Sequence, residues 1–419
     1  MSEASHAPLV KEVHDRLISR RSEYLDLLGR LVMVDSCWAN PDGVREVGRI
    51  IADRLEESGF EISIEPQPTL PAEDKWLHEL LAPGVQTTDL APTIVALRQG
   101  TAKASVLLLG DLDTAYPGGS DGVPFKIVDD RAFGTGIADM QGGLVTLVAS
   151  IEAIVALGVP LPTLTVVLAG DEQCGSLGSR HTIKRVASSA DWALCLECAR
   201  QGENVMAARG HIGVGLLEIM GHEAHAGTDI DKGISAIEGL VQILPPILAL
   251  TAPQKGILVT PTMIDGGSRR SVVPGKVKVV LDLRAIDIAR WRDMTKALET
   301  VVHSFEGPAE LLLRYASHRP GFSQTPEVGV VIEIVQRVGR SIADVPGVVT
   351  SMAAGSSAFA AEAGCVVLDG MGPPGGSLMT SDEHISITGM IRRATILACT
   401  LIDLPLAHSP RFSERGITE

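Results

Sequence analysis

The chain has 419 residues, enough for two or three domains with a large buried core. Its 51 acidic and 36 basic side chains give a formal net charge of -15, which argues against a nucleic acid as a partner. The six cysteines are scattered, no charged-then-apolar leader is present, and no apolar run reaches the roughly 18 residues of a membrane span, so we expect a cytoplasmic protein without a disulfide framework.

The N-terminal region has the pattern of an α/β fold. Apolar residues recur at helical spacing over residues 8–34 and 42–58, and Glu61–Glu65 is a predicted strand. Residues 66–91 contain four prolines and show no clear period, so we expect irregular surface structure there.

Acidic side chains follow three predicted buried strands. The strands and the acids after them are Ser105–Leu109 with Asp111 and Asp113, Leu164–Leu168 with Asp171 and Glu172, and Trp192–Leu196 with Glu197. Ligand sites of α/β sheets lie at the carboxyl ends of their strands, and carboxylates that share a cleft repel each other unless a divalent cation neutralises them. The pattern therefore predicts a metal site. Alternatively, the second acidic loop caps the next helix, with Ser176 or Ser179 as N-cap.

Two further details concern these acids. Asp111 and Asp113 share one face of an extended segment, so one can bind a cation while the other orients a neighbour. Asp139 lies in the glycine-rich stretch Gly134–Gly143, just before a predicted helix at Leu144–Leu157. Asp139 is either a simple N-cap of that helix or a further ligand.

Residues 209–318 have the pattern of a separate β-α-β-β-α-β unit. Its elements are predicted at Ile212–Ile219, Ile234–Leu250, Gly256–Met263, Val277–Leu283, Ile288–Phe305 and Glu310–Tyr315. The flanking regions 1–208 and 319–419 then form the two parts of one α/β domain.

The α/β pattern resumes after this unit. A helix is predicted at Val328–Val338 and a strand at Val366–Leu368, and a long glycine-proline loop, Gly370–His384, precedes a closing helix that ends near Leu404. So large a loop in a compact domain is usually functional. The last dozen residues are expected to form a frayed tail.

These motifs, in this order, resemble the family of co-catalytic metallopeptidases and amidohydrolases that includes glutamate carboxypeptidase, acetylornithine deacetylase, succinyl-diaminopimelate desuccinylase and aminoacylase. The matching segments are Gly110–Thr114, Ala138–Gly143, Asp171–Ser176, the strand-end Glu197, His225 and the terminal glycine-rich loop. The resemblance implies a mixed, mainly parallel sheet sandwiched by helices, with an inserted ferredoxin-like domain that serves as a lid and in dimerisation.

The resemblance also implies a metal site that is smaller than the family's pair. Asp111, Gln173 and Met379 stand where the family has His, Glu and His ligands. A neutral amide and a thioether hold a hard dication poorly, so one site is expected to be empty. The other consists of Asp111, Asp139 and Glu197, an all-oxygen set. We expect one divalent ion, manganese, with zinc, cobalt, iron and magnesium as the other candidates.

The family's catalytic and substrate-binding positions are carried over in the same way. Glu172 corresponds to the catalytic glutamate, Asp113 to the helper aspartate and His225 to a lid histidine supplied by a neighbouring subunit, which implies a homodimer or larger assembly. The candidates for binding a small carboxylate substrate are Arg284, Ser271, Arg270, Ser377, Met379 and Gln173. A surface strand arginine is the alternative interpretation of Arg284.

With a single metal, Glu172 can still activate a water molecule at the metal. The missing second Lewis acid handicaps amide cleavage and favours a substrate that stabilises its own negative charge. An electron-poor aromatic amine is such a substrate, and the family includes an aminohydrolase of this kind. The leading hypothesis is conversion of 5-nitroanthranilate and water to 5-nitrosalicylate and ammonia by nucleophilic aromatic substitution. Tyr116, Phe359 and Met379 could line an aromatic pocket, but core packing explains each equally well.

Two alternatives stay open. One is an amidohydrolase of N-acyl amino acids or a carboxypeptidase. The other is an inactive family member that acts as a binding protein, an idea motivated by the three replaced ligands. The joint presence of Glu172, Asp139, Glu197 and His225 argues against it, because a purely structural descendant would not need them together.

Overall fold

The computed structural model describes residues 3–199, 203–353 and 355–406. The chain forms two compact units, the first from the described parts of residues 1–208, 324–351 and 355–419, and the second from the described parts of residues 209–323 and 352–354. The second unit extends past the predicted limit at 318 because strand β12 (Glu310–Arg319) crosses that position. The predicted tail lies outside the described residues.

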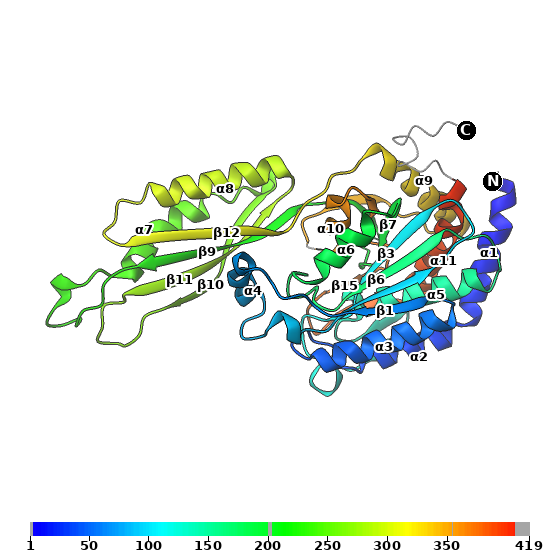
Figure 1. The fold of residues 1–419 in the computed structure, drawn as a ribbon, viewed down its shortest axis with the longest axis horizontal. Coiled ribbons are helices and arrows are strands. Elements are labelled where there is room, and N and C mark those ends of the chain that lie inside the picture. Colours follow the sequence, from blue (N-terminus) through cyan, green and yellow to red (C-terminus); the bar gives the residue numbers. More distant parts are fainter. Residues whose placement is uncertain (1–2, 200–202, 354, 407–419) are drawn as a thin grey trace. The chain divides into compact units, whose positions relative to one another are not determined.

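The first unit is built on a six-stranded sheet (Figure 1). In spatial order its strands are β1 (Glu61–Glu65), β2 (Thr93–Arg98), β6 (Thr163–Ala169), β3 (Ser105–Asp111), β7 (Trp192–Cys195) and β14 (Val366–Leu368). Strands β6, β3, β7 and β14 are parallel to one another, and β2 and β1 extend the sheet antiparallel at one edge. The predicted mixed, mainly parallel sheet is confirmed.

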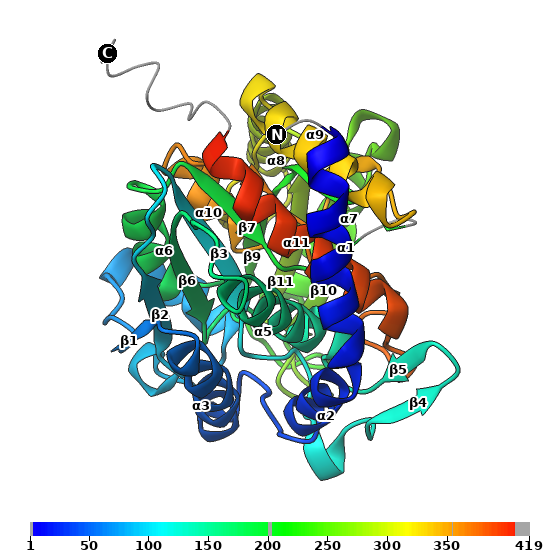
Figure 2. The same cartoon turned by 90° about the vertical axis from the view of Figure 1, so that its right-hand side faces the viewer.

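Helices cover both faces of this sheet (Figure 2). The helices of the first unit are α1 (Glu3–Ser19), α2 (Arg21–Val32), α3 (Pro41–Glu57), α4 (Lys75–Leu81), α5 (Gly142–Val155), α6 (Ser179–Ala187), α9 (Pro326–Ser341), α10 (Ser357–Glu362) and α11 (Ile387–Asp403). Helices α5 and α11 pack together on one face, while α6 and α10 pack together on the other. The resulting core is a continuous cluster of Leu, Ile, Val and Ala side chains.

The helical stretch Ile137–Val155 is long and apolar enough to cross a membrane, so the expectation that no such run exists was wrong. Within the unit, however, 89% of its apolar window is buried. Helix α5 packs against α11 and also contacts β3. A central helix covered on all sides needs no polar face, which explains its composition.

Residues 66–91 were predicted to be irregular, and this prediction was wrong for part of the segment. They contain the two-turn helix α4, in which Leu77 and His78 are buried. Nearby, Ala82, Leu90 and Cys174 form a small separate apolar cluster with Trp38 and Val85 packed against it. Tertiary packing stabilises this short segment, and a helix of this length has no independent signal in the sequence.

Smaller elements complete the first unit. They are the four-stranded sheet of β15 (Gly375–Gly376), β16 (His384–Ser386), β5 (Arg131–Phe133) and β4 (Lys126–Val128), and the pair of β13 (Val348–Ser351) with β8 (Val205–Arg209). Short 3-10 turns of the first unit occur at Ala72–Asp74, Thr87–Asp89, Gly119–Asp121 and Leu404–Leu406, with a π turn at Ile137–Gln141. In the second unit, 3-10 turns occur at Ile230–Lys232 and Pro253–Lys255.

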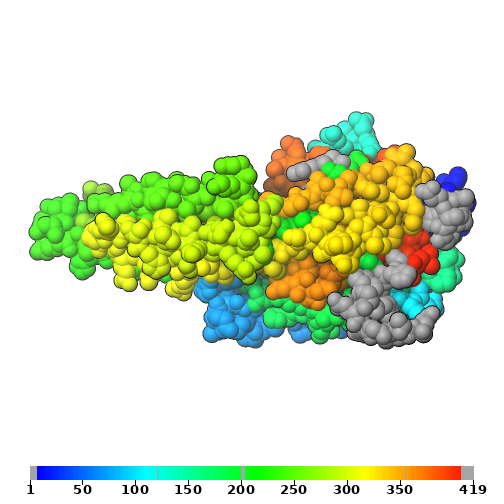
Figure 3. Space-filling view, turned by 90° about the horizontal axis from the view of Figure 1, so that it is seen from above, coloured from blue at the N-terminus to red at the C-terminus, as the bar shows by residue number. Residues whose placement is uncertain are grey.

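The second unit has the predicted β-α-β-β-α-β order. Its antiparallel sheet has the strand order β10 (Ile257–Gly266), β11 (Lys276–Ala285), β9 (His211–Met220) and β12. Helices α7 (Ala236–Leu248) and α8 (Ile288–His303) pack on this sheet and are neighbours on the surface of the unit (Figure 3). The ferredoxin-like topology is therefore confirmed.

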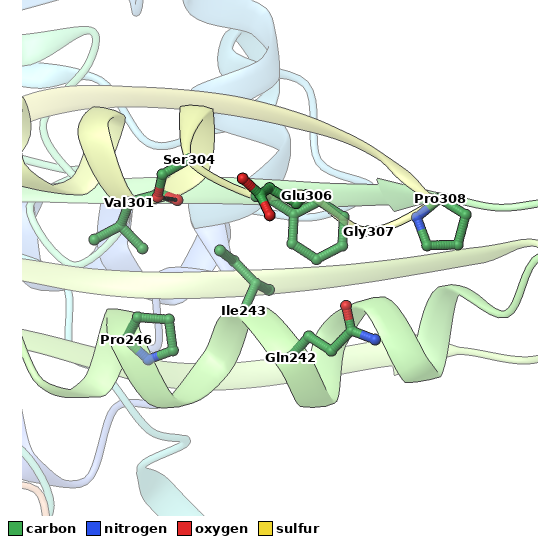
Figure 4. A pocket seen from close by; sticks show the side chains of 9 residues that line it. Gln242, Ile243, Pro246, Val301, Ser304, Glu306, Gly307 and Pro308 are labelled. Atoms are coloured by element: carbon green, nitrogen blue, oxygen red, sulfur yellow. Dashed lines mark hydrogen bonds between the residues drawn. The ribbon is translucent and has the colours of Figure 1, made fainter.

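A groove of about 510 Å³ separates α7 from α8 along part of their length. Figure 4 shows Gln242, Ile243 and Pro246 on one side of it and Val301 and Ser304 on the other. Ile243 is 2% exposed and belongs to the core of the unit. The helix pair is thus packed at its base and open at its outer edge.

Two arginines of the second unit hold a short segment that is distant in sequence. Nη1 of Arg209 donates to the carbonyl oxygen of Ala353 at 3.0 Å, and Nη1 of Arg284 donates to that of Met352 at 3.0 Å. Met352 and Ala353 therefore belong to the second unit, although the chain on either side of them belongs to the first.

Candidate metal centre

The centre of the candidate site is the end of strand β3. Asp111 is the last residue of this central strand, and Asp113 follows two positions later. Their side chains are only 2% and 1% exposed. The parallel neighbours β6 and β7 end beside β3, and this arrangement brings the acidic loops that follow them to the same edge of the sheet.

Asp113 binds the loop that carries the proposed base. Its Oδ1 accepts the backbone N–H of Glu172 at 3.0 Å, and its Oδ2 accepts that of Gln173 at 2.8 Å. Glu172 itself is 8% exposed. The position of Glu172 is therefore fixed through a buried carboxylate of a neighbouring strand.

The alternative role of this loop, helix capping, is performed by a different residue. Oδ2 of Asp171 accepts the backbone N–H groups of Gly178 and Ser179 at 2.9 and 3.3 Å, at the start of α6. Neither Ser176 nor Ser179 caps the helix through its side chain, since the hydroxyl oxygens of both are buried without a hydrogen-bond partner. Asp171 therefore caps α6, and the capping role does not explain the neighbouring Glu172.

Asp139 lies in a tight loop between β5 and α5. Gly136 has φ 68°, and a Cβ there would lie 2.2 Å from Cγ2 of Thr114, so only glycine fits. Asp139 has the extended angles φ -125° and ψ 83° within the π turn, and its bond to Met140 is cis. Asp139 is not the N-cap of α5, because Gln141 precedes that helix and makes no side-chain cap bond.

Glu197 follows β7 on the other side of β3. Its side chain is 3% exposed, and its carbonyl oxygen accepts the N–H of Gly372 at 2.9 Å. Gly143, at the start of α5, packs so closely that a Cβ would lie 2.1 Å from the carbonyl oxygen of Leu196. The start of α5 and the end of β7 are therefore in direct contact.

The electrostatics of these acids are strongly unfavourable for the bare carboxylates. Burial raises the pKa of Asp111 well above its ordinary value, and Glu172, Glu197, Asp113 and Asp139 raise it further, in that order. Burial and the charge of Glu172 likewise raise the pKa of Asp113, against the two hydrogen bonds that lower it. Both carboxylate oxygens of Asp111 are buried without a hydrogen-bond partner.

This donor set fits a hard divalent cation. A buried carboxylate without a partner is costly, and a cation bound by oxygens would satisfy Asp111 and offset the repulsion. As their side chains stand, no three His, Cys, Asp or Glu residues within 3–199, 203–353 and 355–406 form a ready group of ligands. The set of Asp111, Asp139 and Glu197 therefore stays a prediction.

Two of the three residues that replace family ligands are more exposed than Asp111. Gln173 is half-buried, whereas Met379 is 46% exposed. Met379 lines a pocket of about 470 Å³ together with Tyr116, Asp121, Thr135 and other residues of the nearby loops. Phe359, by contrast, is 2% exposed and packs beneath the ammonium group of Lys184.

Ser377, a further substrate-binding candidate, is on the surface of the same terminal loop. It has φ 54°, in the left-handed region, and its carbonyl oxygen accepts the backbone N–H and the hydroxyl of Thr380 at 3.2 and 2.7 Å. Ser377 thus has a backbone conformation that residues other than glycine rarely adopt. Such conformations are found disproportionately at functional sites.

The remaining candidates belong to the second unit. Nδ1 of His225 accepts the backbone N–H groups of Gly227 and Thr228, each at 3.1 Å. Nδ1 is therefore assigned as unprotonated, and Nε2 carries the proton of the neutral ring on an exposed side chain. Such a ring can donate one hydrogen bond to an anion. Arg270 and Ser271 are exposed in the loop that follows β10.

Arg284 has partners within its own unit. Its Nε and Nη2 donate to the two carboxylate oxygens of Asp282 at 2.7 and 3.1 Å, and its Nη1 donates to Met352. A substrate carboxylate would have to compete with Asp282 for this guanidinium group. Residues two apart on a strand share a face, so this pairing is readable from the spacing.

Glu383 is a buried acid that the sequence analysis did not identify. It is 3% exposed, and its carboxylate accepts backbone N–H groups from the Asp139 loop and from Met379. The only indication in the sequence was its place at the end of a long glycine-proline loop, directly before a strand. An acidic residue in such a loop is usually assumed to be exposed.

The sequence matches peptidase family M20/M25/M40 over residues 107–403, so the chain belongs to this family. The family resemblance inferred from the motifs is confirmed. The members of the family are metal-dependent peptidases and amidohydrolases, and the chain is a hydrolase of this class.

Relatives and solved structures agree with this assignment. Carboxypeptidase G2 of Pseudomonas sp. strain RS-16 is 24% identical over 387 residues, 90% of this chain and 88% of that protein. Succinyl-diaminopimelate desuccinylase of Methylococcus capsulatus is 26% identical over 315 residues, 70% of this chain and 81% of that protein. The structure of the di-peptidase Dug1p from Saccharomyces cerevisiae has a TM-score of 0.74 at 15% identity, covering 97% of this chain and 100% of that one, which shows the shared fold.

Replacing the unpartnered carboxylate by an amide should stabilise the metal-free protein. The pKa of Asp111 is higher in the folded than in the unfolded chain, so the folded state favours the protonated carboxyl group. The stability that this group contributes is fully present below about pH 4 and is lost as the pH rises through the folded pKa. We expect chelator-treated Asp111→Asn to melt a few degrees above wild type at neutral pH, for a relief of about 1–3 kcal/mol, and to lose the rise in Tm on adding manganese.

The control is Asp26→Asn, a change at an exposed position on α2. It should leave both melting temperatures unchanged. A lower Tm for metal-free Asp111→Asn at pH 7, or a manganese-induced rise equal to that of wild type, would contradict the assignment of Asp111.

Restoring the two replaced ligands should increase zinc binding. The pair Gln173→Glu and Met379→His supplies the carboxylate and imidazole that suit zinc. We expect elemental analysis to find about one additional zinc per chain in the double variant after dialysis against zinc. The matched pair Gln173→Glu and Met379→Leu lacks the imidazole and should take up less. Equal zinc in both would refute the ligand assignment.

Proposed function

We propose that this chain hydrolyses a carbon–nitrogen bond with one divalent metal ion, manganese, and that its substrate is 5-nitroanthranilate, an aromatic amine that carries a carboxylate and a nitro group. The observation that carries this proposal is the buried, unpartnered carboxylate of Asp111 among four other acids. One of the four, Glu172, has its backbone fixed by another, Asp113. All-oxygen sets suit manganese or magnesium better than zinc.

Glu172 is the proposed general base. It takes a proton from a water molecule while the water oxygen forms a bond to the ring carbon that bears the amino group. The ring and its nitro group hold the negative charge. Glu172 then returns the proton to the amine nitrogen, the carbon–nitrogen bond breaks, and ammonia leaves with 5-nitrosalicylate as the other product.

The other residues have supporting roles in this proposal. A cation held by Asp111, Asp139 and Glu197 would supply Lewis-acid chemistry at the centre. Asp113 keeps Glu172 in place through the backbone hydrogen bond at 3.0 Å. The Nε2–H group of His225 is suited to donate to the developing anion, and Arg270, Ser271 and Arg284 are the candidates for binding the substrate carboxylate.

The pocket beside the centre supports an aromatic substrate. Tyr116 is 55% exposed and Met379 is 46% exposed, and both line the pocket of about 470 Å³. Large apolar side chains exposed on a concave surface are typical of ligand sites. A thioether and a phenol ring together offer favourable contacts to the face or edge of a flat ring.

Cleavage of an amide is the second candidate function. The comparisons favour it, because the named relatives are a carboxypeptidase and a desuccinylase. The same base and the same cation would serve this reaction, with attack at an acyl carbon instead of a ring carbon. The two functions differ in the product that is released.

Ammonia release from 5-nitroanthranilate tests the leading proposal directly. We expect chelator-stripped protein to release ammonia only after manganese is added, because Glu172 alone cannot lower the pKa of water sufficiently. Glu172→Gln should reduce kcat by about 10²–10⁴-fold while retaining manganese, since the amide cannot accept the proton. The control Glu46→Gln changes an exposed residue on α3 and should stay active.

The outcomes separate the candidates. Hydrolysis of N-acyl amino acids without ammonia release from the aromatic amine would replace the leading proposal by the amide reaction. Absence of both activities, with ligand binding unchanged in Glu172→Gln, would favour the binding-protein alternative.

We further propose that the chain forms a homodimer through the second unit. Strand β10 is an edge of its sheet, and its Met263 and Ile264 are 64% and 59% exposed. On the neighbouring helix α7, Val241 and Leu248 are 66% and 48% exposed. An exposed apolar edge strand next to an apolar helix face favours pairing with a second copy.

Charges on this face should separate the dimer. Val241→Glu with Ile264→Lys would bury charges at the interface, so we expect light scattering after gel filtration to show a monomer at micromolar concentration. The control Leu312→Lys changes a residue that is 45% exposed on β12, the opposite edge of the sheet. A wild-type monomer, or a dimer broken only by the control, would contradict the proposed interface.

A further inference from the structure

Glu383 makes an unusual set of hydrogen bonds for a buried carboxylate. Its Oε1 accepts the backbone N–H groups of Ala138 at 2.8 Å and Asp139 at 3.1 Å. Its Oε2 accepts those of Gly136 and Met379, each at 3.3 Å. No charged side chain is needed to hold this carboxylate, because four backbone dipoles point toward it.

These bonds join two loops that are far apart in sequence. Gly136, Ala138 and Asp139 form the turn that presents a predicted metal ligand, whereas Met379 belongs to the terminal glycine-rich loop. The backbone N–H of Gly134 also donates to the carbonyl oxygen of Glu383 at 3.3 Å. One residue thus fixes the turn on one side of the centre and the loop on its rim.

The loop at Met379 requires such a contact. Met379 has φ 60°, so a residue with a long side chain adopts the left-handed backbone region that favours glycine. Conformations of this kind are strained and persist only where the surroundings hold them. The hydrogen bond from Met379 N–H to Glu383 supplies part of that restraint, and Glu383 itself is 3% exposed.

We propose that Glu383 is a positioning residue that locks the Asp139 turn to the Met379 loop, so that the metal ligand and the substrate pocket keep a fixed geometry relative to each other. Glu383 also lines the pocket with Tyr116 and Met379, which places the lock at the boundary between the two. The effect on metal binding rests on the proposed function. The connection between the two loops through the hydrogen bonds of Glu383 does not depend on that function.

The matched control is Asp130, which binds the same C-terminal stretch from the other side. Its carboxylate accepts the hydroxyl of Ser386 at 2.6 Å and the backbone N–H and hydroxyl of Thr388 at 3.0 and 2.5 Å. Asp130 therefore anchors the start of α11, and within the described residues its carboxylate makes no hydrogen bond to the Asp139 turn or to Met379. Asp130→Asn measures the cost of losing a carboxylate anchor in this region alone.

The test uses hydrogen exchange and manganese affinity in the full chain. In metal-free Glu383→Gln, which cannot accept all four N–H groups, we expect the segments around 134–141 and 376–383 to exchange about tenfold faster than in wild type. We expect the manganese Kd, measured by competition with a chromogenic chelator, to rise by about 10–100-fold, as for other residues that orient ligands. Asp130→Asn should change neither value.

A second variant protects the test against failure to fold. Glu383→Asp keeps the charge but is one methylene shorter, so it cannot reach both loops, and at least one of the two segments should exchange faster. Unchanged exchange in both Glu383 variants, or equal effects in Asp130→Asn, would overturn the proposal. Faster exchange in both segments, in a protein that binds no manganese even as wild type, would support the lock and refute the metal-dependent function.

Discussion

The structure of the first unit depends on one unfavourable interaction, the burial of several carboxylates at one edge of a parallel sheet. Asp111 ends the central strand with both oxygens unpartnered, and four other acids raise its pKa further. Strand topology explains why they meet, since β6, β3 and β7 run in the same direction and their following loops reach one edge. A bound cation would offset the repulsion among carboxylates that are concentrated in this way.

Much of this arrangement could be predicted from the sequence. Short apolar runs bounded by glycine and acidic residues identified the central strands, because strands buried on both faces have no polar alternation. The alternation of strands and helices in the second unit was equally clear, and its topology was predicted correctly. The spacing of Asp111 and Asp113 indicated that one of them orients a neighbour, and the family resemblance assigned that role to Asp113. The carboxylate of Asp113 accepts the backbone N–H of Glu172.

Other features could not be predicted, because they depend on contacts between distant segments. Glu383 is defined by backbone N–H groups of residues that precede it by more than two hundred positions, and nothing in its local sequence indicates burial. Helix α4 is stabilised by tertiary packing and lies among prolines. The pairing of Arg284 with Asp282 was visible in the spacing but was outweighed by the family role assigned to that arginine.

The short segment at Met352 and Ala353 limits how the protein can be divided. The second unit is an insertion in sequence, yet two of its arginines, Arg209 and Arg284, take their acceptors from a peptide that returns after a strand of the first unit. A fragment cut at 209 and 323 would therefore carry two guanidinium groups without their carbonyl partners, one of them on a side chain only 1% exposed. Each unit is made of more than one segment of the chain. Neither unit can therefore be transferred as one continuous fragment.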